Sequence, residues 1–491
     1  MREQGVHYRG HPFFACSAPL SRLEMMIGDL VPRRDAPIVV LDGGDEGLAE
    51  KSRLKLAELG YTDLSILEGG CAAWKASGGE LFSGVNVPSK AFGEFVEHHY
   101  ATPRIPASEL KGLLAQKKKL VILDSRPFEE YHRMNIPGGI DVPGAELAWR
   151  VHDLAPDPDT LVVVNCAGRT RSIIGCQSLR NAGIPNRVVA LKDGTMGWDL
   201  AGFECERGSS RTGPEPTATG RAKAREVAQR VAERFSVQFI SVENLREWQQ
   251  DASRTLYLLD VRTREEFEKD RIAGARHAPG GQLVQAADEY VGVRNARVVL
   301  IDTERVRAVM TASWLNQMGW PDVHVLEGGE GLPRESGPRK PRGLVLVPWA
   351  SVREPAGSVL DFSTSLRFRY RHIPGACWVV RSRLAEATDK IDAMGSLTLT
   401  SEDGVLAHLA APEAQALWPQ ATVRVLDGGN AAWKGAWEAG IERATTATDD
   451  VWYKPYDHGS DYEKHAREYL SWEVALVEQI KRDPTIRFRA Y

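Results

Sequence analysis

A cysteine followed closely by two arginines is the feature of this sequence best suited to chemistry. Cys166 opens the run CAGRTRS directly after the apolar stretch LVVVN, and Arg169 and Arg171 follow it. Guanidinium groups and the positive end of a helix both stabilise a thiolate. We therefore predict that Cys166 is ionised, nucleophilic and catalytic. The alternative is a buried structural cysteine, but such a residue needs neither arginine.

The segments on either side of Cys166 predict how it is held. Residues 161–165 are almost entirely apolar, which is typical of a buried strand, and a helical pattern follows the loop 166–171. Loop amides at the start of a helix can point inward and hold an anion. The residues predicted to line this anion site are Ala167, Gly168, Arg169, Thr170, Arg171 and Ser172.

The surroundings of this loop occur four times in the chain. The motifs LEGGCAAW, LKDGTMGW, LEGGEGL and LDGGNAAW each follow the end of an apolar strand by 24 or 25 residues. Strands that alternate with helices at this pitch predict an α/β fold, with parallel sheets covered by helices on both faces. Sites in such folds lie at the carboxyl ends of the strands.

These motifs resemble those of the rhodanese family, through LDSRPFEEY, NIPGG, LVVVNCAGRTRS and LKDGTMGW in the second copy. The resemblance implies four rhodanese-like domains, of which the first lacks its opening strand. The predicted divisions are 1–82 (incomplete and inactive), 104–207 (catalytic), 236–333 and 343–441 (both inactive), and a tail at 445–491 that docks through a helix.

The resemblance also implies a reaction, sulfur transfer through a persulfide on Cys166. A sulfane sulfur would pass from an anionic donor such as thiosulfate to a thiol or to cyanide. We expect Arg169 to bind the donor and Arg171 to hold the loop, because guanidinium groups offer several donors to an anion. The resemblance implies that three further residues support the loop: Asp124, Arg126 and Glu130. Among them, Arg126 would pair with Glu130.

Several alternatives remain open at this point. The donor could be 3-mercaptopyruvate or glutathione persulfide. The cysteine positions of the other copies hold Asp42, Asp302 and Ser401, which cannot carry a sulfane sulfur, so a non-catalytic sulfur carrier or scaffold is a second class of function. A phosphatase of the same fold is disfavoured, because its loop places the arginine six residues after the cysteine.

Composition excludes other classes of function. The 491 residues are 43% hydrophobic and 26% charged with a net charge of −4, which gives no general attraction to nucleic acid or to an anionic membrane. Six scattered cysteines show no metal-ligand spacing, and we expect no metal, no cofactor and a cytoplasmic location, with homo-oligomerisation left open. Cys176 should face the core, whereas Lys90, His98 and His99 read as solvated linker residues.

Overall fold

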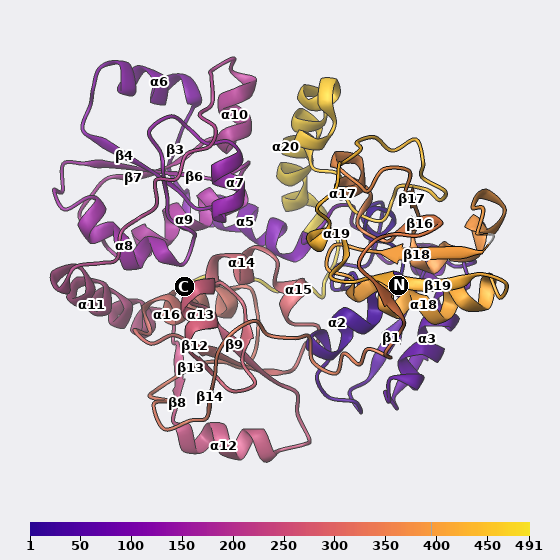
Figure 1. The fold of residues 1–491 in the computed structure, drawn as a ribbon. Coiled ribbons are helices and arrows are strands. Elements are labelled where there is room, and N and C mark those ends of the chain that lie inside the picture. The colour runs from indigo at the N-terminus through magenta and orange to yellow at the C-terminus, as the bar shows by residue number, and fades with distance from the viewer. Residues whose placement is uncertain (394) are drawn as a thin grey trace. The chain divides into compact units, whose positions relative to one another are not determined.

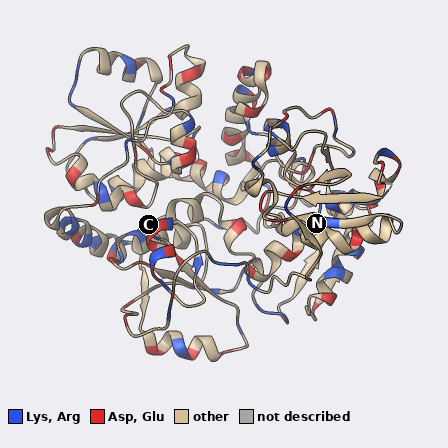
Figure 2. Ribbon diagram, in the orientation of Figure 1, with Lys and Arg blue, Asp and Glu red and all other residues tan. Residues whose placement is uncertain are grey.

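The computed structural model describes residues 1–393 and 395–491, which divide into two compact units. The first unit comprises residues 1–28, 37–85 and 340–459, and the second comprises residues 29–36, 86–339 and 460–491. Residues of both charge signs are interspersed along the helices of each unit (Figure 2). Within the described ranges, no helix combines the length and the apolar character needed to cross a bilayer.

The second unit is built on two parallel sheets of five strands. The first sheet contains β3 (Arg104–Ile105), β4 (Leu120–Asp124), β5 (Ile140–Asp141), β6 (Leu161–Asn165) and β7 (Val188–Leu191), in the order β3-β7-β6-β4-β5. The second contains β8 (Gln238–Ile240), β9 (Leu256–Asp260), β11 (Arg276–His277), β12 (Arg297–Ile301) and β13 (Val323–Leu326). Its order, β8-β13-β12-β9-β11, repeats that of the first sheet.

Helices cover both faces of each sheet in this unit. On the first sheet, α6 (Ala107–Ala115) and α10 (Gly194–Leu200) pack on one face, and α8 (Glu146–Leu154) and α9 (Thr170–Asn181) pack on the other. A single buried cluster joins α8 and α9 to α11 (Ala218–Arg234), α14 (Gly280–Gln285) and α16 (Val306–Gln317) of the second sheet. Figure 1 shows these helices gathered between the two sheets.

The first unit contains the remaining two copies of the repeat. A parallel sheet of five strands has the same order again, in β15 (Ser351–Val352), β19 (Thr422–Leu426), β18 (Ser396–Thr400), β16 (Ser358–Asp361) and β17 (Cys377–Trp378). The first copy has only two parallel strands, β1 (Ile38–Val40) and β2 (Leu64–Ile66). The predicted α/β fold of repeated parallel sheets is confirmed, while the predicted domain boundaries remain a prediction.

The first copy shares its unit with the fourth copy, residues 340–459. Arg381 donates to both carboxylate oxygens of Glu24 at 2.9 Å, and the two side chains are buried. Such paired charge-assisted hydrogen bonds fix two segments in register. Within its unit, the incomplete first copy is therefore joined to the fourth copy, which lies more than 250 residues further along the chain.

Candidate active site

Cys166 lies where β6 ends and α9 is about to begin. Its exposed fraction is 2%, so the thiol is almost fully enclosed. The helix starts at Thr170, earlier than the sequence predicts, so Thr170, Arg171 and Ser172 belong to its first turn. The hydroxyl of Ser172 donates to the carbonyl of Arg169 at 2.8 Å and closes that turn.

A second segment, at the start of α10, holds this loop through backbone hydrogen bonds. The amide of Thr195 donates to the carbonyl of Cys166 at 2.8 Å, and that of Met196 to Ala167 at 2.9 Å. Gly194 has a positive φ of 57°, and a Cβ there would lie 2.4 Å from the Cys166 carbonyl. This close approach explains physically why the L-x-x-G marker ends in glycine.

Arg171, which the sequence analysis expects to hold the loop, makes three hydrogen bonds from the first turn of α9. It donates to both oxygens of Glu130, at 2.7 and 3.3 Å, and to Gln282 at 3.3 Å. Burial alone would lower the pKa of Arg171, but the charges of Glu130 and Cys166 raise it above its ordinary value. A permanently charged guanidinium therefore lies close enough to Cys166 to interact with its charge.

Arg169 is placed differently from the expectation that it binds a donor. It is 5% exposed and its guanidinium contacts three carboxylates, those of Glu94, Glu97 and Asp193. Glu94 accepts two hydrogen bonds of 2.7 Å from it. With its charge offset by three anions, Arg169 joins α9 to α5 (Val87–Tyr100) and is poorly suited to hold an anionic substrate.

Two of the three predicted supporting residues, Asp124 and Arg126, form an ion pair with each other at the end of β4. Arg126 donates to both oxygens of Asp124, at 2.8 and 2.7 Å, and to the carbonyl of Met134. Asp260 and Arg262 repeat this arrangement in the third copy, which has no thiol in its loop. We therefore assign the Asp–Arg pair to the fold, and Glu130 to Arg171.

Two helices that the sequence did not place at the site contribute side chains next to the loop, which sequence reasoning missed. The stretch read as a linker forms α5, and Lys90 on it is buried. The tail forms α20 (Tyr462–Ile480), whose Tyr469 and Glu473 pack against the loop at Gly168. The sequence predicts only that the tail docks through a helix, and Glu473 is separated from the loop by about 300 residues of chain.

The equivalent loops of the other copies fill their own anion sites. The carboxylate of Asp42 accepts from the amides of Gly44 and Ala49 at 2.9 and 3.0 Å. The carboxylate of Asp302 accepts from the amides of Glu304 and Arg307, and the hydroxyl of Ser401 accepts from Ala407. A side chain that satisfies the loop amides leaves no room for a substrate anion there.

A thiol alone should not give such a loop the sulfur-transfer activity that the family resemblance leads us to expect of the second copy. Ser401→Cys, introduced together with Cys166→Ser, should give no sulfur transfer, because Leu406 stands where Arg171 stands in the second copy. The measurement is thiocyanate formation from thiosulfate and cyanide. Turnover above that of Cys166→Ser alone would show that the guanidinium is dispensable.

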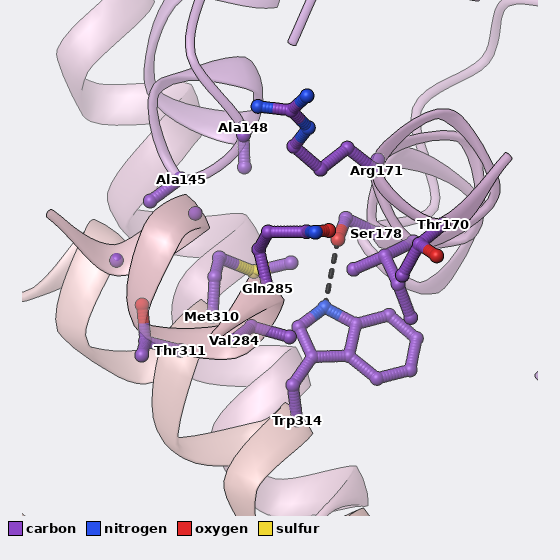
Figure 3. Close-up of a pocket in the computed structure, with 15 residues that line it drawn as sticks. Ala145, Ala148, Thr170, Arg171, Ser178, Val284, Gln285, Met310, Thr311 and Trp314 are labelled. Carbon is purple, nitrogen blue, oxygen red and sulfur yellow. Dashed lines mark hydrogen bonds between the residues drawn. The ribbon is translucent and has the colours of Figure 1, made fainter. Parts of the chain in front are cut away.

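A pocket lies beside the first turn of α9, lined by residues of α8, α9, α14 and α16 (Figure 3). Trp314 donates to the hydroxyl of Ser178 at 2.8 Å across it, and Arg171 borders it. Its other walls are mostly glycine and apolar side chains, so it offers no further charge to a substrate. Across residues 1–393 and 395–491, no three His, Cys, Asp or Glu side chains are arranged to hold a metal ion.

Comparisons with known proteins agree with this architecture. The rhodanese-like domain family matches residues 106–201 and 241–330. The crystal structure of a thiosulfate sulfurtransferase from Pseudomonas aeruginosa is 46% identical, with a TM-score of 0.94 over 100% of this chain and 95% of that one. An HTH-type transcriptional regulator of Mycobacterium tuberculosis is 37% identical over 126 residues, which are 23% of this chain. The chain spans 54% of the length of that curated relative.

Three parallel sheets with the same strand order make this an α/β protein built of repeats. Of the four equivalent loops, the one after β6 carries a cysteine, Cys166. Because this architecture agrees with the family match and with the similarity over the whole length of the chain, the chain belongs to the rhodanese family.

Proposed function

We propose that this protein is a sulfurtransferase that carries a sulfane sulfur on Cys166. The observation that carries the proposal is the difference between the four equivalent loops. The loops of the first, third and fourth copies place a hydrogen-bonded carboxylate or hydroxyl at the anion site. The loop of the second copy places the Cys166 thiol there, beside the charged Arg171. The name of the whole-length relative from Pseudomonas aeruginosa supports the same reaction.

The proposed reaction has two half-reactions. The Cys166 thiolate attacks the outer sulfur of the donor, so that a new S–S bond forms while the bond inside the donor breaks. With thiosulfate, the leaving group is sulfite and the product is the Cys166 persulfide anion. A thiol or cyanide then attacks the outer sulfur and releases the Cys166 thiolate, which completes a double displacement.

An anionic donor fits the loop through Arg171 rather than through Arg169. The charge of Arg171 already interacts with that of Cys166, whereas the three carboxylates around Arg169 would repel a dianion. Thiosulfate is the donor we propose. Donors such as 3-mercaptopyruvate or glutathione persulfide, and a non-catalytic carrier, are the rival proposals.

We also propose that the division into 1–82, 104–207, 236–333, 343–441 and 445–491 describes the functional parts, with catalysis confined to the second. None of the six cysteines forms a disulfide in the part of the chain that the structure describes. Persulfide chemistry requires reduced thiols, so we propose a cytoplasmic location.

Steady-state kinetics with thiosulfate and cyanide test the function. Double displacement predicts parallel lines in double-reciprocal plots, and a specificity constant for thiosulfate above that for 3-mercaptopyruvate. A preference for 3-mercaptopyruvate would replace the proposed donor, and no thiocyanate from either donor would favour the carrier.

A further inference from the structure

Glu473 is a fully buried carboxylate whose two oxygens have very different surroundings. Its Oε1 accepts hydrogen bonds from Tyr469 at 2.9 Å and from Thr170 at 3.1 Å, and the ammonium of Lys90 lies 3.2 Å away. Among residues 1–393 and 395–491, its Oε2 has no hydrogen-bond partner although it is buried. Leaving a buried acceptor unsatisfied costs about 1–3 kcal/mol, so folding alone gives no reason for this arrangement.

The unpartnered oxygen faces the loop that carries Cys166. A Cβ built on Gly168 would lie 3.3 Å from Oε2 of Glu473 and 3.4 Å from the ring of Tyr469. Burial and the charge of Glu473 raise the pKa of Tyr469 well above its ordinary value, and the charge of Cys166 contributes to that shift. Tyr469 thus stays protonated and holds Oε1, which leaves Oε2 directed at the loop.

The other carboxylates around the loop are already engaged. Glu94, Glu97 and Asp193 contact Arg169, Glu130 contacts Arg171, and Asp124 contacts Arg126. Of these and Glu473, only Glu473 keeps an unpartnered buried oxygen against the loop, in the part of the chain that the structure describes.

We infer that Glu473 is the base that takes the proton of a thiol acceptor in the second half-reaction. This inference rests on the proposed function. The acceptor S–H bond breaks and its proton moves to Oε2, while the resulting thiolate forms a bond to the outer sulfur of the Cys166 persulfide. The S–S bond to Cys166 breaks, its electron pair returns to the Cys166 thiolate, and the proton later leaves Glu473 for water.

The test separates the two half-reactions in the full-length chain. Enzyme loaded with thiosulfate is freed of donor and mixed with either β-mercaptoethanol or sulfite, at a pH where sulfite is the dianion and has no proton to lose. Glu473→Gln should slow discharge by the thiol by about 10²–10⁴-fold, the usual contribution of a positioned base. Loading by thiosulfate and discharge by sulfite should not change.

The pH dependence adds a readout that a structural role would not move. The thiol-specific loss should shrink as pH rises toward the pKa of the free thiol, because solution then supplies the thiolate. The charged and titratable groups that interact with Glu473 or with its partner Tyr469 are Lys90, Glu94, Cys166, Arg171 and Tyr469 itself. All of them are unchanged in the variant, so a common titration would affect thiol and sulfite alike.

Two further variants serve as controls. Glu468→Gln removes an exposed carboxylate of the same helix and should leave both discharge rates unchanged. Glu473→Asp keeps a carboxylate and should recover part of the thiol rate. Equal losses with thiol and sulfite, or a thiol rate untouched in Glu473→Gln, would overturn the inference. If the wild-type chain forms no persulfide, the proposed function itself fails, which is a distinct result.

Discussion

Replacing Cys166 with serine should abolish sulfur transfer, by on the order of 10⁴-fold or more in kcat, the scale seen when a covalent nucleophile is removed. A serine hydroxyl is far less acidic than a thiol and a far weaker nucleophile toward sulfur, so it does not take up the sulfane sulfur of the donor. The measurement is thiocyanate formed from thiosulfate and cyanide, together with circular dichroism to show that the fold is kept.

A matched control for this variant is Cys205→Ser in the same part of the chain. Cys205 is half-buried and burial raises the pKa of its thiol to about 11, so it is mostly protonated at neutral pH. Its loss should leave turnover unchanged. Near-normal turnover in Cys166→Ser, or a loss only in Cys205→Ser, would contradict the assignment of the nucleophile.

Arg169→Met should lower the free energy of unfolding by about 3–5 kcal/mol, the cost of leaving buried charges without their partner. The carboxylate of Glu94 is fully buried and would lose two charge-assisted hydrogen bonds. Urea unfolding followed by circular dichroism measures the change. Because Arg169 does not face a donor in this account, the ratio of the specificity constants for thiosulfate and 3-mercaptopyruvate should stay the same.

Arg104→Met is the matched control, because Arg104 pairs with the same Glu97 at 2.8 Å but is 42% exposed. Exposed ion pairs contribute up to about 1 kcal/mol, so this variant should be far milder. If both variants cost equally little, the carboxylates around Arg169 are not a buried network. If Arg169→Met selectively lowers the specificity constant for thiosulfate, Arg169 binds the donor after all.

Local pattern was enough to predict the strand and the loop that follows it, while the role of Cys166 as the nucleophile stays a prediction. The run LVVVNC is apolar and short, and the repeated glycine marker is explained by one backbone contact, so both are visible in the sequence. The burial of Cys176 follows from its place on the apolar stripe of its helix, and the structure confirms it at 0% exposure. Burial also raises the pKa of that thiol to about 12, which suits a core residue rather than a second reactive cysteine.

Long-range contacts could not be predicted in this way. The role of Arg169 depends on Glu94 and Glu97, which lie on a helix that the sequence suggested was a solvated linker. The prediction that Lys90 is a solvated linker residue is wrong for the same reason, because Lys90 is buried and its ammonium contacts Glu473. Nothing near Glu473 in the sequence indicates a site, because only the packing of the tail helix brings it to the loop.

The mass of the intact protein after incubation with thiosulfate tests the central claim most directly. We expect an increase of about 32 Da, one sulfur atom, which is absent in Cys166→Ser and removed by cyanide. An unchanged mass in the wild-type chain, or the same adduct in Cys166→Ser, would contradict the claim that Cys166 carries the transferred sulfur.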